Sequence, residues 1–144
     1  MDLRQQMNIV AACNCRITQL YGEWAKQCGW SYHTMITLYA LNMGRPCTQK
    51  QIAEEWLIPK QTVNTVIKDL ERRGLVRFEA GRDQKEKPVS FTEAGRTYAE
   101  KKLEALYQME ERVMDHMGPE VCRALVESSR AFAQALAKEV DHGA

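Results

Sequence analysis

The most constraining feature of this sequence is the order of patterns in the middle third of the chain. A capping box that starts at Thr48 opens a short helix, and Pro59 begins a second, longer helical segment. Gly74 ends that segment, and the residues in 75–79 and 89–92 are strand-like on either side of a polar turn. Two helices joined by a tight turn and followed by a β-hairpin predict a winged helix-turn-helix.

Helical patterns flank this segment on both sides. Apolar residues recur at helical spacing in 2–27, and Ser31 is a suitable N-cap for a helix that runs through Met43. Helical spacing returns in 93–117 and again, after Gly118 and Pro119, in 120–140. We therefore predict one domain, 1–144, that is mainly α with a small β-hairpin wing. Its parts are a helical dimerisation region in 1–44 and 93–144 and a winged helix-turn-helix in 45–92.

Composition narrows the class of protein. The chain has 144 residues, of which 44% are hydrophobic and 27% charged, as in soluble globular proteins. No apolar run approaches the roughly 20 residues that span a bilayer, and the first residues do not resemble a signal peptide. Five cysteines without a CxxC pair and three scattered histidines predict reduced thiols and no metal site. We expect a cytoplasmic protein that needs no cofactor and does not bind membranes.

Charge is unevenly distributed along the chain. Residues 45–92 carry ten Lys and Arg against seven Asp and Glu, whereas residues 93–144 carry seven against ten. The winged segment is thus basic and the C-terminal segment acidic, although the whole chain has a net charge of only +1. This asymmetry indicates an anion-binding face in the middle of the chain.

Residues 60–73 carry the strongest indication of function. Their aliphatic side chains form one stripe of a helix, namely Val63, Val66, Ile67 and Leu70. The opposite side of the helix, which we call the reading face, carries polar residues at the same helical spacing: Gln61, Asn64, Thr65, Lys68 and Arg72. Amides pair with adenine in the major groove, while Lys and Arg contact guanine or phosphate. The pattern predicts a recognition helix for double-stranded DNA, with the basic hairpin residues Arg82, Lys85 and Lys87 as a second contact.

Thr48 to Gly95 resembles the winged-helix core of the MarR family of bacterial transcription regulators. The resemblance is carried by Thr48-x-x-x-Ile52-Ala53-Glu54, by Thr62-Val63, by Asp69 to Val76, by Asp83-x-Lys85 and by Phe91-Thr92-x-x-Gly95. Together with the reading face it implies the following DNA-binding residues: Thr48, Gln49, Lys60, Gln61, Thr62, Asn64, Thr65, Lys68, Arg72, Arg82, Asp83, Lys85 and Lys87.

Three positions depart from the family pattern. Lys85 stands where an arginine is usual, and it keeps the charge but loses the planar fork of guanidinium. Leu57 replaces a turn glycine, at a cost of about 1 kcal/mol if the turn needs a left-handed residue. Pro88, in the returning wing strand, removes a backbone donor. None of the three alters the reading face, so we predict a divergent member.

The resemblance also implies a homodimer on a pseudo-palindromic operator, a repressor function, and a small aromatic or lipophilic effector. The terminal helices hold more apolar surface than a lone core requires, which independently favours a dimer. The candidate effector-pocket residues are aromatic or flexible and precede the winged segment; they are Tyr21, Trp24, Trp30, Tyr32, Met35 and Tyr39.

Three alternatives stay open from the sequence. One is a thiol-based redox sensor of the same fold that uses Cys13, although Cys13 and Cys15 point to different sides of their helix. A zinc sensor would need a set such as Glu23, Cys28, His33 and His116. A winged-helix protein-interaction module would present the same helix to a protein. An enzyme is not expected, because no nucleophile–base pair or phosphate-binding glycine loop occurs.

Overall fold

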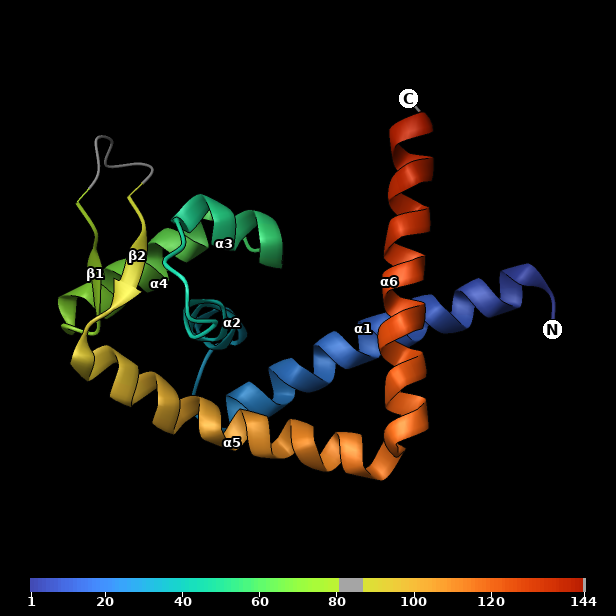
Figure 1. Cartoon of the computed structure of the whole chain (residues 1–144), viewed down its shortest axis with the longest axis horizontal. Helices are drawn as coiled ribbons and strands as arrows, with labels where there is room; N and C mark the ends of the chain where they lie inside the picture. The colour runs from blue at the N-terminus through green and yellow to red at the C-terminus, as the bar shows by residue number, and fades with distance from the viewer. Residues whose placement is uncertain (81–86, 144) are drawn as a thin grey trace. The chain divides into compact units, whose positions relative to one another are not determined.

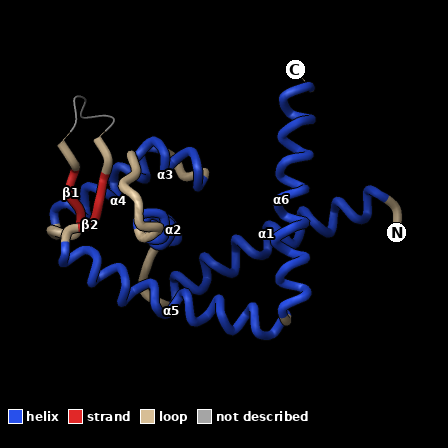
Figure 2. The backbone as a smooth tube through the Cα atoms, in the orientation of Figure 1, coloured by secondary structure: helices blue, strands red, loops and turns tan. Residues whose placement is uncertain are grey.

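The computed structural model describes residues 1–80 and 87–143, nearly all of them in helices or in short loops between helices (Figure 1, Figure 2). The elements in chain order are α1 (Leu3–Gln27), α2 (Tyr32–Leu41), α3 (Gln49–Trp56), α4 (Lys60–Arg72), β1 (Val76–Phe78), β2 (Val89–Phe91), α5 (Glu93–Met117) and α6 (Pro119–His142). The mainly α fold with a hairpin wing is confirmed. The chain forms two compact units, an N-terminal unit (Met1–Leu103) and a C-terminal unit (Glu104–Ala144).

Local capping sets where the helices of the N-terminal unit begin. Asp2 caps α1 in a capping box with Gln5, in which each side chain accepts from the other residue's backbone N–H, at 2.8 and 2.9 Å. The Ser31 hydroxyl accepts from the Thr34 N–H at 3.0 Å and caps α2, as predicted. These side chains satisfy backbone donors that a helix start leaves without a partner.

The second helix ends earlier than predicted. The sequence suggested that it runs through Met43, but α2 stops at Leu41 with Asn42 as its C-cap. The Met43 N–H bonds to the Ala40 carbonyl, a tighter turn than the α-helical one, before Gly44 takes a positive φ of 86°. The apolar pattern continues through this tight turn, so spacing alone placed the boundary two residues late.

The core of the N-terminal unit lies between α2, α3 and α4 and extends to the hairpin and the start of α5. Its largest fully buried side chains come from every one of these helices: Met35, Leu38, Ile52, Ile67, Leu70 and Leu103. All aliphatic residues of the predicted stripe on α4 are buried or half-buried. Burial of this stripe fixes which side of α4 remains outside.

The hairpin pairs β1 and β2 in antiparallel register, with Val76 opposite Phe91 and Phe78 opposite Val89. Cys47 adds a bridge on the other side of Val89, with backbone hydrogen bonds of 2.8 and 3.4 Å. Pro88 precedes β2 instead of lying within it, and its carbonyl accepts from the Glu79 N–H at 2.8 Å. The missing donor of this proline therefore interrupts no part of the described ladder.

The C-terminal unit contains the end of α5 and all of α6, which meet at Gly118 with a φ of 83°. Pro119 occupies the first turn of α6, where its fixed φ suits a helix start. None of the residues of α6, which is described over its whole length, is buried. Among the described helices, none is long and apolar enough to cross a membrane.

Candidate nucleic-acid interface

Helix α4 separates an aliphatic side from a polar side, as predicted. Val63, Ile67 and Leu70 are buried, while Gln61 and Lys68 are exposed. Of the remaining residues of the reading face, Thr65 and Arg72 are exposed and Asn64 is half-buried. No hydrogen bond or ion pair joins the side chains of Gln61, Asn64 or Lys68 to other described residues, so their polar groups remain available to a ligand.

The cationic end of α4 is partly neutralised. Arg72 pairs with Asp69 one turn earlier, and Arg73 lies 3.6 Å from the other oxygen of the same carboxylate. The guanidinium of Arg73 also stacks over the Tyr98 ring at 4.9 Å, and hydrogen bonding to Tyr98 raises the pKa of Arg73. Arg72 is the more exposed of the two arginines, and it belongs to the reading face.

The turn before α4 has the geometry of a helix-turn-helix. Leu57 follows α3 in the left-handed region, with φ 52° and ψ 45°, and is the one non-glycine residue with positive φ in the described parts of the chain. Ile58 is buried and donates to the Ala53 carbonyl at 3.1 Å, after which the Pro59 carbonyl accepts from the first turn of α4. The turn thus needs the left-handed residue that a glycine normally supplies.

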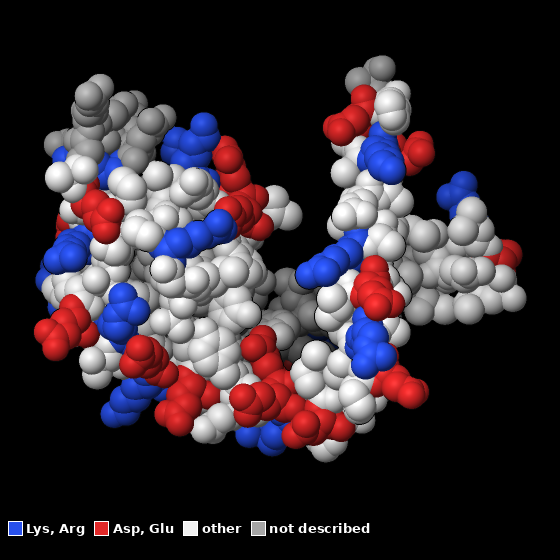
Figure 3. All heavy atoms as spheres, viewed as in Figure 1, with Lys and Arg blue, Asp and Glu red and all other residues white. Residues whose placement is uncertain are grey.

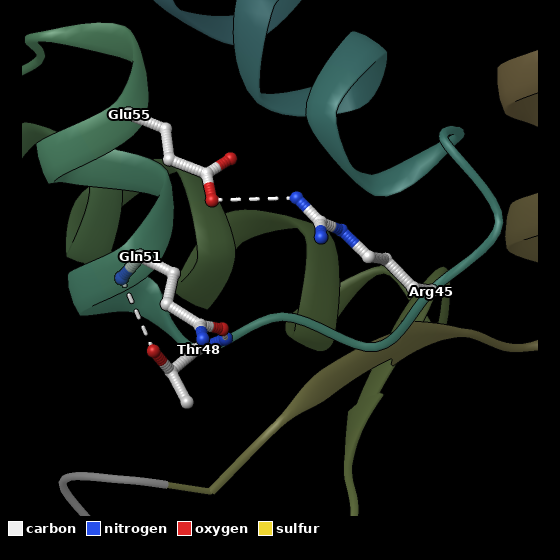
Figure 4. Close-up of polar contacts among 4 residues, drawn as sticks. All are labelled: Arg45, Thr48, Gln51 and Glu55. Carbon is white, nitrogen blue, oxygen red and sulfur yellow. Dashed lines mark hydrogen bonds and ion pairs between the residues drawn. The ribbon is translucent and has the colours of Figure 1, made fainter.

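Thr48 is the N-cap of α3 (Figure 4), and Gln49 is the first residue of this helix. The Thr48 hydroxyl accepts from the Gln51 N–H at 3.1 Å, and the Gln51 side chain accepts from the Thr48 N–H at 2.9 Å, which confirms the predicted capping box. Arg45 reaches from the preceding loop to Glu55, at 3.3 Å. Because the capping bond uses Thr48 as an acceptor, its hydroxyl proton remains available for donation to a phosphate.

Of the predicted wing residues, Lys87 is half-buried beside β2, while Arg82, Asp83 and Lys85 lie outside the described residues. On the face shown in Figure 3, Lys and Arg side chains are interspersed with Asp and Glu. The modest positive charge of the winged segment is therefore not gathered into a large patch in this view.

A tight junction connects the end of α4 to the start of α5. The Thr92 hydroxyl donates to the Gly74 carbonyl at 2.6 Å and accepts from the Gly95 N–H at 3.0 Å, while the Thr92 N–H donates to the Leu75 carbonyl at 3.1 Å. A Cβ on Gly95 would lie 1.6 Å from the Leu75 oxygen. The Thr-x-x-Gly motif thus holds the base of the hairpin against α5 by a close approach of two backbones.

Comparisons with known proteins agree with this arrangement. Residues 30–86, from before α2 through the first part of the wing, match the sequence model of the MarR family. A MarR family regulator from Neisseria meningitidis is 28% identical, with 100% of both chains covered and a TM-score of 0.81. The winged-helix segment of the chain thus matches the MarR family, and the whole chain is similar in fold to a regulator of that family.

Two more distant MarR family structures share the fold. MepR from Staphylococcus aureus, solved with DNA, is 18% identical, with 89% of this chain and 94% of that chain covered and a TM-score of 0.64. MarR from Staphylococcus aureus, solved with salicylate and kanamycin, is 16% identical, with 94% and 93% covered and a TM-score of 0.72. No curated protein matches the chain.

The aromatic residues predicted to line an effector pocket pack mainly in pairs. Trp24 meets Trp30 edge-on, with ring centroids 6.3 Å apart, and Tyr39 meets Trp56 of α3 at 5.5 Å. Tyr32 packs on His33, Met35 is fully buried and Tyr21 is half-buried. Lys102 of α5 lies over the Trp30 ring at 5.6 Å. Their role in effector binding stays a prediction.

The cysteines differ in exposure. Cys13 and Cys15 are exposed on α1, while Cys28, Cys47 and Cys122 are half-buried. Burial, and then the negative charge of Glu55, raise the pKa of the Cys47 thiol, so that thiol is the less reactive protonated form at neutral pH. Within residues 1–80 and 87–143, no three His, Cys, Asp or Glu residues form a group that could hold a metal ion.

A cavity of about 410 Å³, which the sequence did not indicate, lies between the N-terminus of α2 and the side of α4. From α2 it is lined by Ser31, His33 and Thr34, of which Ser31 had been considered as a cap and His33 as a zinc ligand. From α4 it is lined in part by Thr62 and Thr65, two of the predicted DNA-binding residues. Sequence spacing could not reveal it, because the two helices meet only in the folded chain.

Proposed function

We propose that this protein is a homodimeric transcription repressor that binds a specific double-stranded DNA operator through α4 and is released by a small-molecule effector. The observation that carries the proposal is the division of α4 into a buried aliphatic side and a reading face with unpaired amides and an ammonium group. Such a helix fits the major groove, where Asn and Gln pair with adenine and Lys contacts guanine or phosphate. The likeness of the fold to MepR, which was solved with DNA, supports the same use of the fold here.

Dimerisation is supported by apolar side chains that the single chain leaves exposed. In α1 only Ala25 is buried, and residues such as Leu3, Ile9 and Ile17 are at least half exposed. In α6 none of the described residues is buried, although Leu125, Val126, Phe132 and Leu136 recur along it. Long helices with so little burial are marginal in water, so a partner must cover them, and a second copy offers the same surfaces. Two recognition helices would then contact half-sites about one helical turn apart.

The deciding experiment replaces Gln61, Asn64 and Lys68 together with alanine. Specific operator affinity should be lost while the circular dichroism spectrum and the oligomeric state are unchanged, because the three side chains make no hydrogen bond or ion pair with other described residues and none of them is fully buried. Lys101→Ala on α5 is the matched control, since it removes an exposed cation away from α4. The probe is a duplex obtained by selection from random DNA with the wild-type protein.

Two outcomes would contradict the proposal. If the triple variant binds the selected duplex as tightly as wild type, α4 is not the recognition helix. If wild-type affinity for DNA does not decrease with salt concentration, phosphate contacts are absent, and the interface serves a protein partner instead. Arg82→Ala with Lys85→Ala should weaken binding to all sequences similarly, since a wing that holds the backbone does not discriminate bases.

Effector release is supported by the aromatic pairs between α1, α2 and α3 and by the salicylate bound to MarR from Staphylococcus aureus. Aromatic and lipophilic compounds should reduce DNA binding by the wild-type protein in a fluorescence anisotropy assay. Trp30→Ala should remove this response and keep DNA binding, because Trp30 lies outside α3 and α4. Loss of the response in Lys101→Ala as well would show that Trp30 has no specific role.

A further inference from the structure

The cavity beside α4 has features that neither the reading face nor the predicted effector pocket explains. It opens between the N-terminus of α2 and the side of α4, two helices that lie next to each other in the N-terminal unit (Figure 1). Hydroxyl groups of Ser31, Thr34, Thr62 and Thr65 and the ring of His33 line it above an apolar floor. Most of the polar groups are hydrogen-bond donors or can act as donors.

Several polar groups at the N-terminus of α2 and on α4 have no partner among the described residues. The Nδ1 atom of His33 is shielded from solvent and makes no hydrogen bond. The N–H groups of Tyr32 and His33 lie in the first turn of α2, where no intrahelical acceptor exists, while Ser31 satisfies only the N–H of Thr34. The Thr62 hydroxyl also bonds to none of the described residues. Unsatisfied donors and the positive end of a helix dipole favour an anionic oxygen ligand.

The only charged residue that lines the cavity, Asp69, does not oppose an anion. Its two carboxylate oxygens are bonded or close to Arg72 and Arg73, so these three groups together carry a net positive charge. The Arg72 side chain is 78% exposed and that of Arg73 43%, and both follow Asp69 at the C-terminal end of α4. The surroundings of the cavity therefore favour an anion.

The position of the cavity on α4 identifies the anion. At 3.6 residues per turn, Thr62 and Asp69 lie about a quarter turn from Gln61 and Arg72, and Thr65 lies between these two sets. When the reading face points into a major groove about 12 Å wide, the side of the helix faces the sugar-phosphate backbone that borders the groove. We propose that the cavity between α2 and α4 receives a phosphate group of the operator backbone, held by the N-terminus of α2, His33 and Thr62. This inference rests on the proposed function, and it adds a DNA contact from α2.

The test asks whether the loss of affinity caused by neutralising one phosphate depends on the side chains that line the cavity. In the selected duplex, each phosphate beside a half-site is replaced in turn by an uncharged methylphosphonate, and affinity is measured for wild type and for His33→Phe with Thr62→Val. Both substitutions keep side-chain shape, and Phe can retain the edge-on contact with Tyr32. Thr97→Val on α5 is the control, because its hydroxyl bonds only within its own helix, to Glu93.

With wild type and with the control, one phosphate per half-site should cost about tenfold in affinity when neutralised, as expected for charge-assisted hydrogen bonds. The double variant should bind the unmodified duplex more weakly and should lose most of that penalty at this phosphate alone. An unchanged set of penalties in the double variant would overturn the inference. A second result would also overturn it: inorganic phosphate, at constant ionic strength and without DNA, shifts the His33 ring resonances while the affinity penalties of the methylphosphonate duplexes stay unchanged in the double variant. The cavity would then hold a free anion and not a phosphate of the operator. If wild type binds no duplex at all, it is the proposed function that fails.

Discussion

Leu57 in the turn between α3 and α4 offers a direct measurement of backbone strain in the helix-turn-helix. Its φ of 52° and ψ of 45° lie in the left-handed region, which costs an L-residue roughly 1–2 kcal/mol. The residue is 89% exposed, so little packing offsets this cost or would be lost when the side chain is removed. Leu57→Gly removes the strain, but the more flexible glycine stabilises the unfolded chain by roughly 0.5–1 kcal/mol. The expected net gain in the free energy of unfolding is about 0.5–1 kcal/mol.

Urea unfolding followed by circular dichroism, at one fixed protein concentration, measures this gain. The concentration must be fixed because the stability of a dimer depends on it. In thermal unfolding the same gain corresponds to an increase in Tm of about 2–4 °C.

Leu57→Ala is the matched control for the glycine variant. Alanine also removes the exposed side chain but retains the Cβ that causes the strain, so its stability should lie within about 0.5 kcal/mol of wild type. If the glycine variant is no more stable than the alanine variant, the left-handed conformation is not strained in the folded protein. The departure from the family pattern at this position would then have no energetic cost.

Three further predictions follow from the packing. Gly95→Ala should destabilise the protein by about 3 kcal/mol or more in urea unfolding. The new Cβ would lie 1.6 Å from the Leu75 carbonyl oxygen, so the backbone of one of the two segments would have to shift. A variant as stable as wild type would show that the two backbones can separate at little cost. Leu136→Glu should yield monomers in sedimentation velocity. Leu136 is 52% exposed in the single chain, so a charge there would destabilise a dimer interface without destabilising the folded chain. An intact dimer would show that this surface of α6 is not the interface. Iodoacetamide should label Cys47 more slowly than an unfolded thiol, and the rate should increase only at alkaline pH, because its pKa is raised; rapid labelling at pH 7 in peptide mass spectrometry would contradict this.

The features that the sequence predicted well depend on residues close together in the chain. Asp2, Ser31 and Thr48 cap helices through bonds to residues three positions away, and glycines end helices through their own φ. The periodicity of α4 is equally local, which is why both its buried stripe and its reading face could be assigned before the fold was known. The resemblance to the family pointed to Leu57 as a residue that stands where a turn glycine is usual, and the structure places it in the left-handed region.

The features that the sequence missed depend on which helices become neighbours. Tyr39 of α2 packs on Trp56 of α3, and Lys102 of α5 lies over the Trp30 ring, contacts that no spacing in the sequence indicated. The cavity beside α4 likewise requires α2 to lie against α4, and no spacing within either helix encodes that contact. Side-chain chemistry at such places can be interpreted only after the fold has brought the residues together.

The junction at Thr92 limits how an effector could move the recognition helix. Thr92 bonds to the carbonyls of Gly74 and Leu75 at the end of α4 and to the N–H of Gly95 in the first turn of α5. Because Gly95 lies directly against the Leu75 backbone, α4 cannot rotate about its own axis without breaking these hydrogen bonds. Each lost bond would leave a polar backbone group without a partner, at a cost of about 1–3 kcal/mol. An effector that changes the spacing of two recognition helices would therefore move α4 together with the first turns of α5, as one rigid group.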